Sequence, residues 1–96
     1  MTELTLISTD DRPIKPLVAA ALENELRLLE AGIQRTRLRL ETFEQKYRFS
    51  TSEFIEKYEK NELDETLELA EWVGEQRMLE RLREKIKTLK GVRFAN

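Results

Sequence analysis

The sequence predicts an all-α fold in which two long antiparallel amphipathic helices are joined by a short helix. Leu, Glu, Lys and Arg are abundant in this chain, which has only three Gly and two Pro, a composition that favours helix. Apolar residues recur at helical spacing over two long stretches, and helix-capping signals separate these stretches. With 96 residues, the chain has the length of one domain with a thin core.

The first long helix is expected over about 16–47, with Pro16 in its first turn, where a missing N–H costs nothing. Its main apolar face has alternating spacings of four and three: Ala19, Leu22, Leu26, Leu29, Ile33, Thr36, Leu40, Phe43 and Tyr47. A weaker stripe with the same spacing lies nearly opposite: Leu17, Ala21, Leu28, Ala31 and Leu38. One hairpin cannot cover both faces, so we expect a partner chain or dimerisation to complete the fold.

The junction after this helix carries the clearest local signals. Ser50 and Glu53 have the spacing of a capping box, and Phe49 and Phe54 have the spacing of a hydrophobic staple. They predict a short helix over about 51–60, which Asn61 ends in a left-handed conformation.

The second long helix is predicted over 65–90, with Asp64 as its cap and Gly91 as its end. Gly74 lies inside it and predicts a close helix crossing on the face shared by Leu67, Ala70 and Met78. The helices form one domain over 16–92. Residues 1–15 are interpreted as a mobile arm. The β-prone start of this arm has no second strand to pair with in the chain, so the alternative is a strand that pairs with the sheet edge of a partner.

Charge is segregated along the chain although the net charge is only −2. Residues 53–75 hold nine acids and two lysines, whereas residues 76–93 hold seven bases and two acids. One interpretation is structural, because acids near the start and bases near the end of a helix stabilise its dipole. The other is functional: the acidic segment suits a basic partner, and the basic C-terminal helix, with the arginines of the first helix, suits phosphates.

The chain lacks the residues on which most enzymes depend. Histidine and cysteine are absent, which removes the usual base, the most reactive nucleophile and the common zinc ligands. Glu68, Glu71 and Glu75 have helical spacing and raise the possibility of a magnesium-dependent phosphohydrolase. The first helix offers only scattered acids to complete such a site, so a solvated face is favoured. We therefore expect no enzyme, no cofactor and no metal.

No stretch approaches the roughly 20 apolar residues needed to span a bilayer, and residues 1–11 lack the features of a signal peptide. These observations, with the absence of cysteine, predict a cytoplasmic protein without a membrane partner.

The segment from Phe43 to Glu75 resembles a family of small helical antitoxins encoded beside TumE-like toxins in bacteria and archaea. A Phe-Glu and a Lys-Tyr, a Ser-capped short helix with Glu-Phe, a Glu-Leu, an acidic turn and a Glu-Trp carry the likeness: Phe43, Glu44, Lys46, Tyr47, Ser50, Glu53, Phe54, Tyr58, Glu62, Leu63, Asp64, Glu71 and Trp72. Asn61 stands where the family pattern has Gly, and the acidic turn is shorter. The resemblance implies a protein that neutralises a small toxin by wrapping it, and it implies no catalytic residues.

The predicted function is accordingly a non-enzymatic protein-binding module, the antitoxin of a toxin–antitoxin pair. The predicted partner contacts are the second apolar stripe and the acidic segment, represented by Leu28, Leu38, Glu62, Asp64, Glu68, Glu71 and Trp72. For Trp72 a core position is the more usual reading, although large aromatics also anchor interfaces. The alternative is a coiled-coil homodimer with a structural or nucleic-acid-associated role through its basic C-terminal helix.

Overall fold

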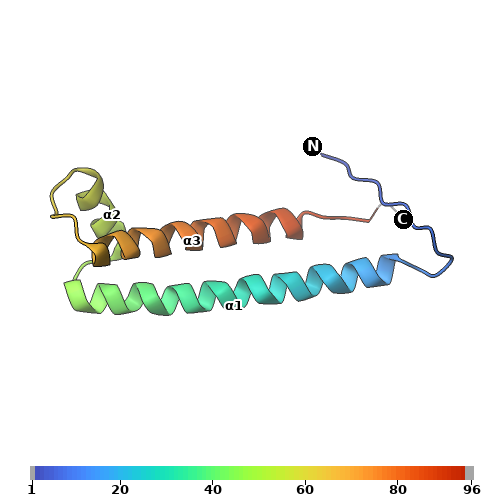
Figure 1. Cartoon of the computed structure of the whole chain (residues 1–96), viewed down its shortest axis with the longest axis horizontal. Coiled ribbons are helices and arrows are strands. Elements are labelled where there is room, and N and C mark those ends of the chain that lie inside the picture. Colours follow the sequence, from blue (N-terminus) through green and yellow to red (C-terminus); the bar gives the residue numbers. More distant parts are fainter. Residues whose placement is uncertain (1, 95–96) are drawn as a thin grey trace.

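A computed structural model describes residues 2–94 and has three helices: α1 (Lys15–Tyr47), α2 (Thr51–Glu59) and α3 (Leu67–Lys90). The two long helices run antiparallel and side by side, and the short α2 packs where the chain turns between them (Figure 1). The molecule is an elongated hairpin of 60 × 25 × 18 Å. The predicted all-α fold is confirmed, and no strand occurs between residues 2 and 94.

The two apolar faces of α1 have opposite fates. Every residue of the main face is buried or half-buried against the rest of the hairpin. Every residue of the second stripe is exposed, with exposed fractions of 67% for Leu17, 59% for Leu28 and 63% for Leu38. The helical period of the sequence therefore identifies the inner face of α1 correctly.

The register between α1 and α3 repeats every two turns. Gly32 faces Leu82, Arg39 donates a hydrogen bond to Glu75 at 3.0 Å, and Lys46 pairs with Glu68 at 2.6 Å. Each step of seven residues along α1 is matched by a step of seven back along α3, the heptad spacing of a left-handed helix pair.

The core is concentrated at the α2 end of the hairpin. Phe54 of α2 and Trp72 of α3 are completely buried, and their rings stack with centroids 3.9 Å apart. Phe43 and Tyr47 of α1 stack on Trp72 at 5.4 and 5.6 Å. Stacked aromatic rings bury much surface for few residues, so this end of a small protein is its best-packed part.

The junction signals are confirmed in part. Ser50 accepts a hydrogen bond from the Glu53 N–H at 3.1 Å, and Asn61 is left-handed with φ 56°. The second bond of the capping box, from the Ser50 N–H to the Glu53 carboxylate, is not formed. The neighbouring Thr51 N–H donates to the Glu44 carboxylate at 2.7 Å. A long side chain from the preceding helix reaches this donor, which sequence spacing does not reveal.

Two expectations for α3 are wrong. Its cap is Thr66, whose hydroxyl accepts from the Leu69 N–H at 3.1 Å, rather than Asp64, so the helix starts two residues later than predicted. Between residues 2 and 94 no helix crosses at Gly74, where a Cβ would meet nothing within 4 Å. The close approach is at Gly32 of α1, where a Cβ would lie 3.3 Å from the Leu82 side chain. Gly91 ends the helix as predicted.

The segment before α1 is extended and exposed over residues 2–8, with Leu4 83% and Ile7 87% exposed. Position 1 of the predicted arm lies outside the described residues. Among the described helices, none is long and apolar enough to cross a membrane.

Candidate functional site

A strongly acidic surface covers α2, the turn after it and the first turns of α3. We call it the acidic end and define it by its exposed carboxylates: Glu53, Glu56, Glu59, Glu62, Asp64, Glu65 and Glu71. Only two of these acids have a basic partner in the described part of the chain: Glu56 with Lys60 at 3.0 Å, and Glu62 with Lys57 at 3.9 Å. The other five leave uncompensated negative charge on this surface.

The acidic end is held in place by the aromatic core beneath it. Trp72 donates a hydrogen bond from Nε1 to the hydroxyl of Thr51 at 3.1 Å, which fixes the first turn of α2 to α3. The ring of Phe54, which like Thr51 belongs to α2, stacks on Trp72. Because burial and a satisfied hydrogen bond both restrain α2, its carboxylates sit on a rigid support.

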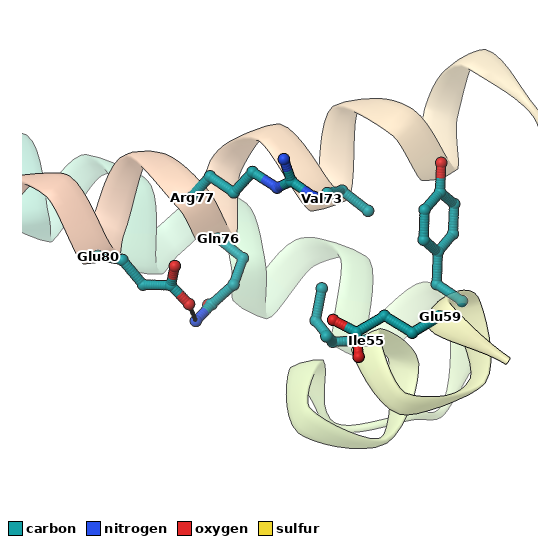
Figure 2. Close-up of a pocket in the computed structure, with 7 residues that line it drawn as sticks. Ile55, Glu59, Val73, Gln76, Arg77 and Glu80 are labelled. Carbon is teal, nitrogen blue, oxygen red and sulfur yellow. Dashed lines mark hydrogen bonds between the residues drawn. The ribbon is translucent and has the colours of Figure 1, made fainter.

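A groove of about 340 Å³ runs between α2 and α3 within this region. Ile55 and Tyr58 from α2 and Val73 from α3 provide its apolar lining, while Glu59, Gln76, Arg77 and Glu80 supply its polar groups. Figure 2 shows Glu59 reaching across α2 near Ile55, and Gln76 joined to Glu80 by a hydrogen bond of 3.2 Å on α3. Sequence reasoning missed this groove, because it depends on how α2 crosses α3.

A second groove lies between α1 and α3 and is lined by Arg39, Thr42, Phe43, Glu71 and Glu75. One of its walls carries the exposed carboxylate of Glu71, while that of Glu75 is already paired with Arg39 at 3.0 Å.

Lys46 and Glu68 form the tightest ion pair of the hairpin. Lys46 Nζ donates to both carboxylate oxygens of Glu68, at 2.6 and 2.8 Å. This hydrogen bonding lowers the pKa of Glu68 and raises the pKa of Lys46. Burial raises the pKa of the neighbouring Tyr47, and the carboxylate of Glu68 raises it further. The pair therefore joins α1 to α3 beside the aromatic core.

The predicted contact residues separate into three groups. Leu28 and Leu38 are exposed on α1, on the side away from α3. Glu62, Asp64 and Glu71 are exposed in the acidic end. Glu68 and Trp72 are different, because Glu68 is half-buried and held by Lys46, and Trp72 has no exposed surface.

The choice of Trp72 as a partner contact is thus corrected. Its indole fills the space between α1, α2 and α3 and stacks on three rings. Apolar surroundings and a hydrogen-bond partner for Nε1 are what a core tryptophan requires. Thr51 supplies that partner, and no local sequence signal marks it for this role.

Two of the three glutamates with the spacing of magnesium ligands form ion pairs across the hairpin. Glu68 and Glu75 each pair with a cation of α1, and Glu71 stands apart on the surface. Within residues 2–94 no three acidic side chains gather closely enough to hold a metal ion. A signal for these pairs was present: Arg39 and Lys46 are seven residues apart, as are Glu68 and Glu75, with opposite charge.

Comparison with protein families, with curated proteins and with solved structures finds no match to this chain.

Proposed function

We propose that this chain is a non-enzymatic protein-binding module, the antitoxin of a toxin–antitoxin pair, and that its acidic end captures a small toxin with a basic surface. The observation that carries the proposal is the acidic end itself: five exposed carboxylates without basic partners, mounted on the best-packed part of the fold. Rigid surfaces on which one sign of charge predominates speed association with a partner of opposite charge and reject partners of like charge.

An apolar contact lies within the same surface. Leu67, at the start of α3, is 78% exposed and lies one turn before Glu71. Protein interfaces combine an apolar centre with a polar rim. Leu67 and the apolar lining of the α2–α3 groove would form the apolar centre, and the carboxylates would form the polar rim.

The groove suits a long cationic side chain from the partner. Its lining offers the ring of Tyr58 and the aliphatic surfaces of Ile55 and Val73, with Glu59 and Glu80 at its edge. An arginine side chain packs its stem on apolar surface and its guanidinium against carboxylates or an aromatic face. Arg77 also lines the groove, so an incoming cation would share these carboxylates with it.

The likeness of residues 43–75 to TumE-associated antitoxins adds the biological role, whereas the surface supports only capture of a basic protein. The test begins with the protein encoded beside this one. We expect that expressing the neighbour alone slows growth, and that co-expression restores growth and yields a complex that co-purifies. A harmless neighbour that forms no complex would overturn the proposal.

Charge reversal locates the contact. Changing Glu59 and Asp64 to Lys should weaken binding of the neighbour by at least tenfold, because each reversal replaces attraction by repulsion at the interface. The matched control changes Glu23 and Glu30, exposed acids of α1, to Lys, which alters the net charge equally. If both variants lose affinity equally, only the overall charge matters and the acidic end is not the contact.

The nucleic-acid alternative has its own test. Labelled duplex DNA and single-stranded RNA are titrated with the full chain at low and high salt, and fluorescence anisotropy is recorded. We expect no salt-dependent binding. Binding that weakens steeply with salt and disappears in the Arg81→Glu, Arg83→Glu variant would favour the alternative, since phosphate contacts release counterions.

A further inference from the structure

The side of α1 that faces away from α3 carries a continuous second seam. We call it the outer seam and define it by eight exposed residues at alternating spacings of four and three: Leu17, Ala21, Asn24, Leu28, Ala31, Arg35, Leu38 and Thr42. Thr42, at its end, also borders the groove between α1 and α3. Figure 1 shows α1 along one long edge of the molecule, with α3 and α2 on its other side. Nothing in the described part of the chain covers this edge.

The apolar residues of this seam, Leu17, Ala21, Leu28, Ala31 and Leu38, occupy positions that a coiled-coil interface uses. Residues at alternating steps of four and three stay on one side of a helix that winds slowly around a partner. The seam extends over 25 residue steps, or about 38 Å. Its three leucines are each more than half exposed. Exposed apolar residues in a line mark an interaction surface more often than scattered ones do.

The side chains of the outer seam match in size and polarity those of a second seam that runs in the opposite direction. When the seam is laid against an antiparallel copy with Leu28 opposite Ala31, each large residue meets a small one: Leu38 meets Ala21, and Leu17 meets Thr42. The two polar residues meet each other, because Asn24 then lies opposite Arg35. The Thr42 hydroxyl already donates to the Leu38 carbonyl at 3.0 Å, so its methyl group is free to face a leucine.

We propose that the outer seam binds the outer seam of a second copy of this chain, giving an antiparallel two-fold dimer centred between Leu28 and Ala31. In this register Arg35 of one copy lies beside Asn24 and Glu25 of the other, so its charge is paired rather than buried alone. Each contact occurs twice, as two-fold symmetry requires.

A parallel dimer fits the same seam poorly. Parallel pairing places every residue opposite itself, so Arg35 faces Arg35 and Ala31 faces Ala31. The first pairing repels, and the second leaves a gap between leucine rungs. A seam that is complementary only when reversed points to a second copy rather than to an unrelated helix.

The dimer goes beyond the proposed function and leaves the acidic end free. It reassigns Leu28 and Leu38, which the sequence suggested as toxin contacts, to self-association. The dimer proposal and the toxin-capture proposal can fail separately, because the dimer is tested on the chain alone and toxin capture is tested with the neighbouring protein.

The absence of cysteine in this sequence allows single thiol reporters. In the antiparallel register the two copies of Ala31→Cys lie about 4.5 Å apart along the helix axis, whereas two copies of Leu38→Cys lie about 26 Å apart. A short thiol crosslinker should therefore join Ala31→Cys chains to one another but not Leu38→Cys chains. A mixture of Ala21→Cys and Leu38→Cys chains should link efficiently.

Light scattering on the unmodified chain should give twice its 11.4 kDa mass. Leu28→Glu should raise the dimer dissociation constant roughly tenfold or more, because it puts a charge into two apolar rungs. Leu67→Glu, at an exposed leucine of α3, is the matched control and should leave the dimer intact. Helix content by circular dichroism checks that both variants fold.

A monomer at millimolar concentration would overturn the proposal, and so would self-linking of Leu38→Cys chains, which indicates a parallel pair. A dimer of folded Leu28→Glu chains as tight as the unmodified one would overturn it equally, because the contact would then lie elsewhere.

Discussion

At the scale of single residues, the fold depends on a few polar contacts next to the aromatic core. The bond from Trp72 Nε1 to Thr51 is buried, at 3.1 Å. Both residues are buried, and no buried side-chain nitrogen or oxygen of the described residues lacks a hydrogen-bond partner. Loss of one partner in such a pair costs more than the bond itself contributes.

Thr51→Val should therefore lower the free energy of unfolding by about 1–3 kcal/mol, because the Trp72 N–H is left buried without an acceptor. Urea unfolding followed by circular dichroism measures the change, because this signal does not depend on the single tryptophan of the chain. Thr51→Ser keeps the hydroxyl and should cost less. In a Trp72→Phe background, which has no N–H to satisfy, Thr51→Val should also cost less; an equal cost in both backgrounds would mean that the hydrogen bond is not the cause.

The Lys46–Glu68 pair predicts a pH dependence. The pKa of Glu68 is lowered below its ordinary value of 4.5 in the folded chain, so the pair stabilises the fold above that pH. The stabilisation is lost as pH falls through the lowered pKa. At the alkaline end, the raised pKa of Lys46 means that stabilisation is present below 10.5 and is lost as pH rises through the raised value.

We expect Glu68→Gln to be less stable than the unmodified chain at neutral pH, with the difference shrinking as the solution is acidified below pH 4.5. Thermal unfolding at a series of pH values measures this difference. Glu71→Gln is the matched control, an exposed carboxylate on the same helix without an ion pair, and should change the stability at neutral pH little. An equal loss of stability at neutral pH in both variants would contradict a specific pair.

At the scale of elements, the two helical glycines have different surroundings. Gly32 is buried at the α1–α3 contact, and a Cβ there would lie 3.3 Å from Leu82 Cδ1. Gly74 is exposed, with open space around it. Both lose the same backbone entropy in a helix, so only their neighbours distinguish them.

Gly74→Ala should raise the free energy of unfolding by about 1 kcal/mol, the difference in helix propensity. Gly32→Ala should give a smaller gain, because the Leu82 side chain must move by a few tenths of an ångström to admit the methyl group. Chemical unfolding of the two variants compares them directly. A loss of stability in Gly74→Ala would show that another chain packs closely on this face of α3.

At the scale of the whole molecule, the hairpin keeps its surfaces apart. The acidic end lies where α2 closes the turn (Figure 1), while the outer seam consists of exposed residues along α1. Two long helices bury each other's seams and little else, so a chain of this shape has more apolar surface than one hairpin can cover. If both proposals hold, an antiparallel dimer presents its two acidic ends at opposite ends of the assembly.

The sequence by itself determined the helices, their inner faces and most of their ends. The main apolar face from Ala19 to Tyr47 and the second stripe through Leu28 follow from the helical period, which is a local property. Ser50, Asn61 and Gly91 act within a few residues, so their roles are also readable from the chain.

Only the tertiary structure decided which residues meet across the hairpin. Three contacts join residues that lie apart in the sequence: the cap of Thr51 by Glu44, the bond between Thr51 and Trp72, and the ion pair of Lys46 with Glu68. The position of the α2–α3 groove depends on the angle at which the two helices cross. The open face at Gly74 is of the same kind. Local propensity sets what a segment forms, whereas packing of one segment on another sets what it contacts.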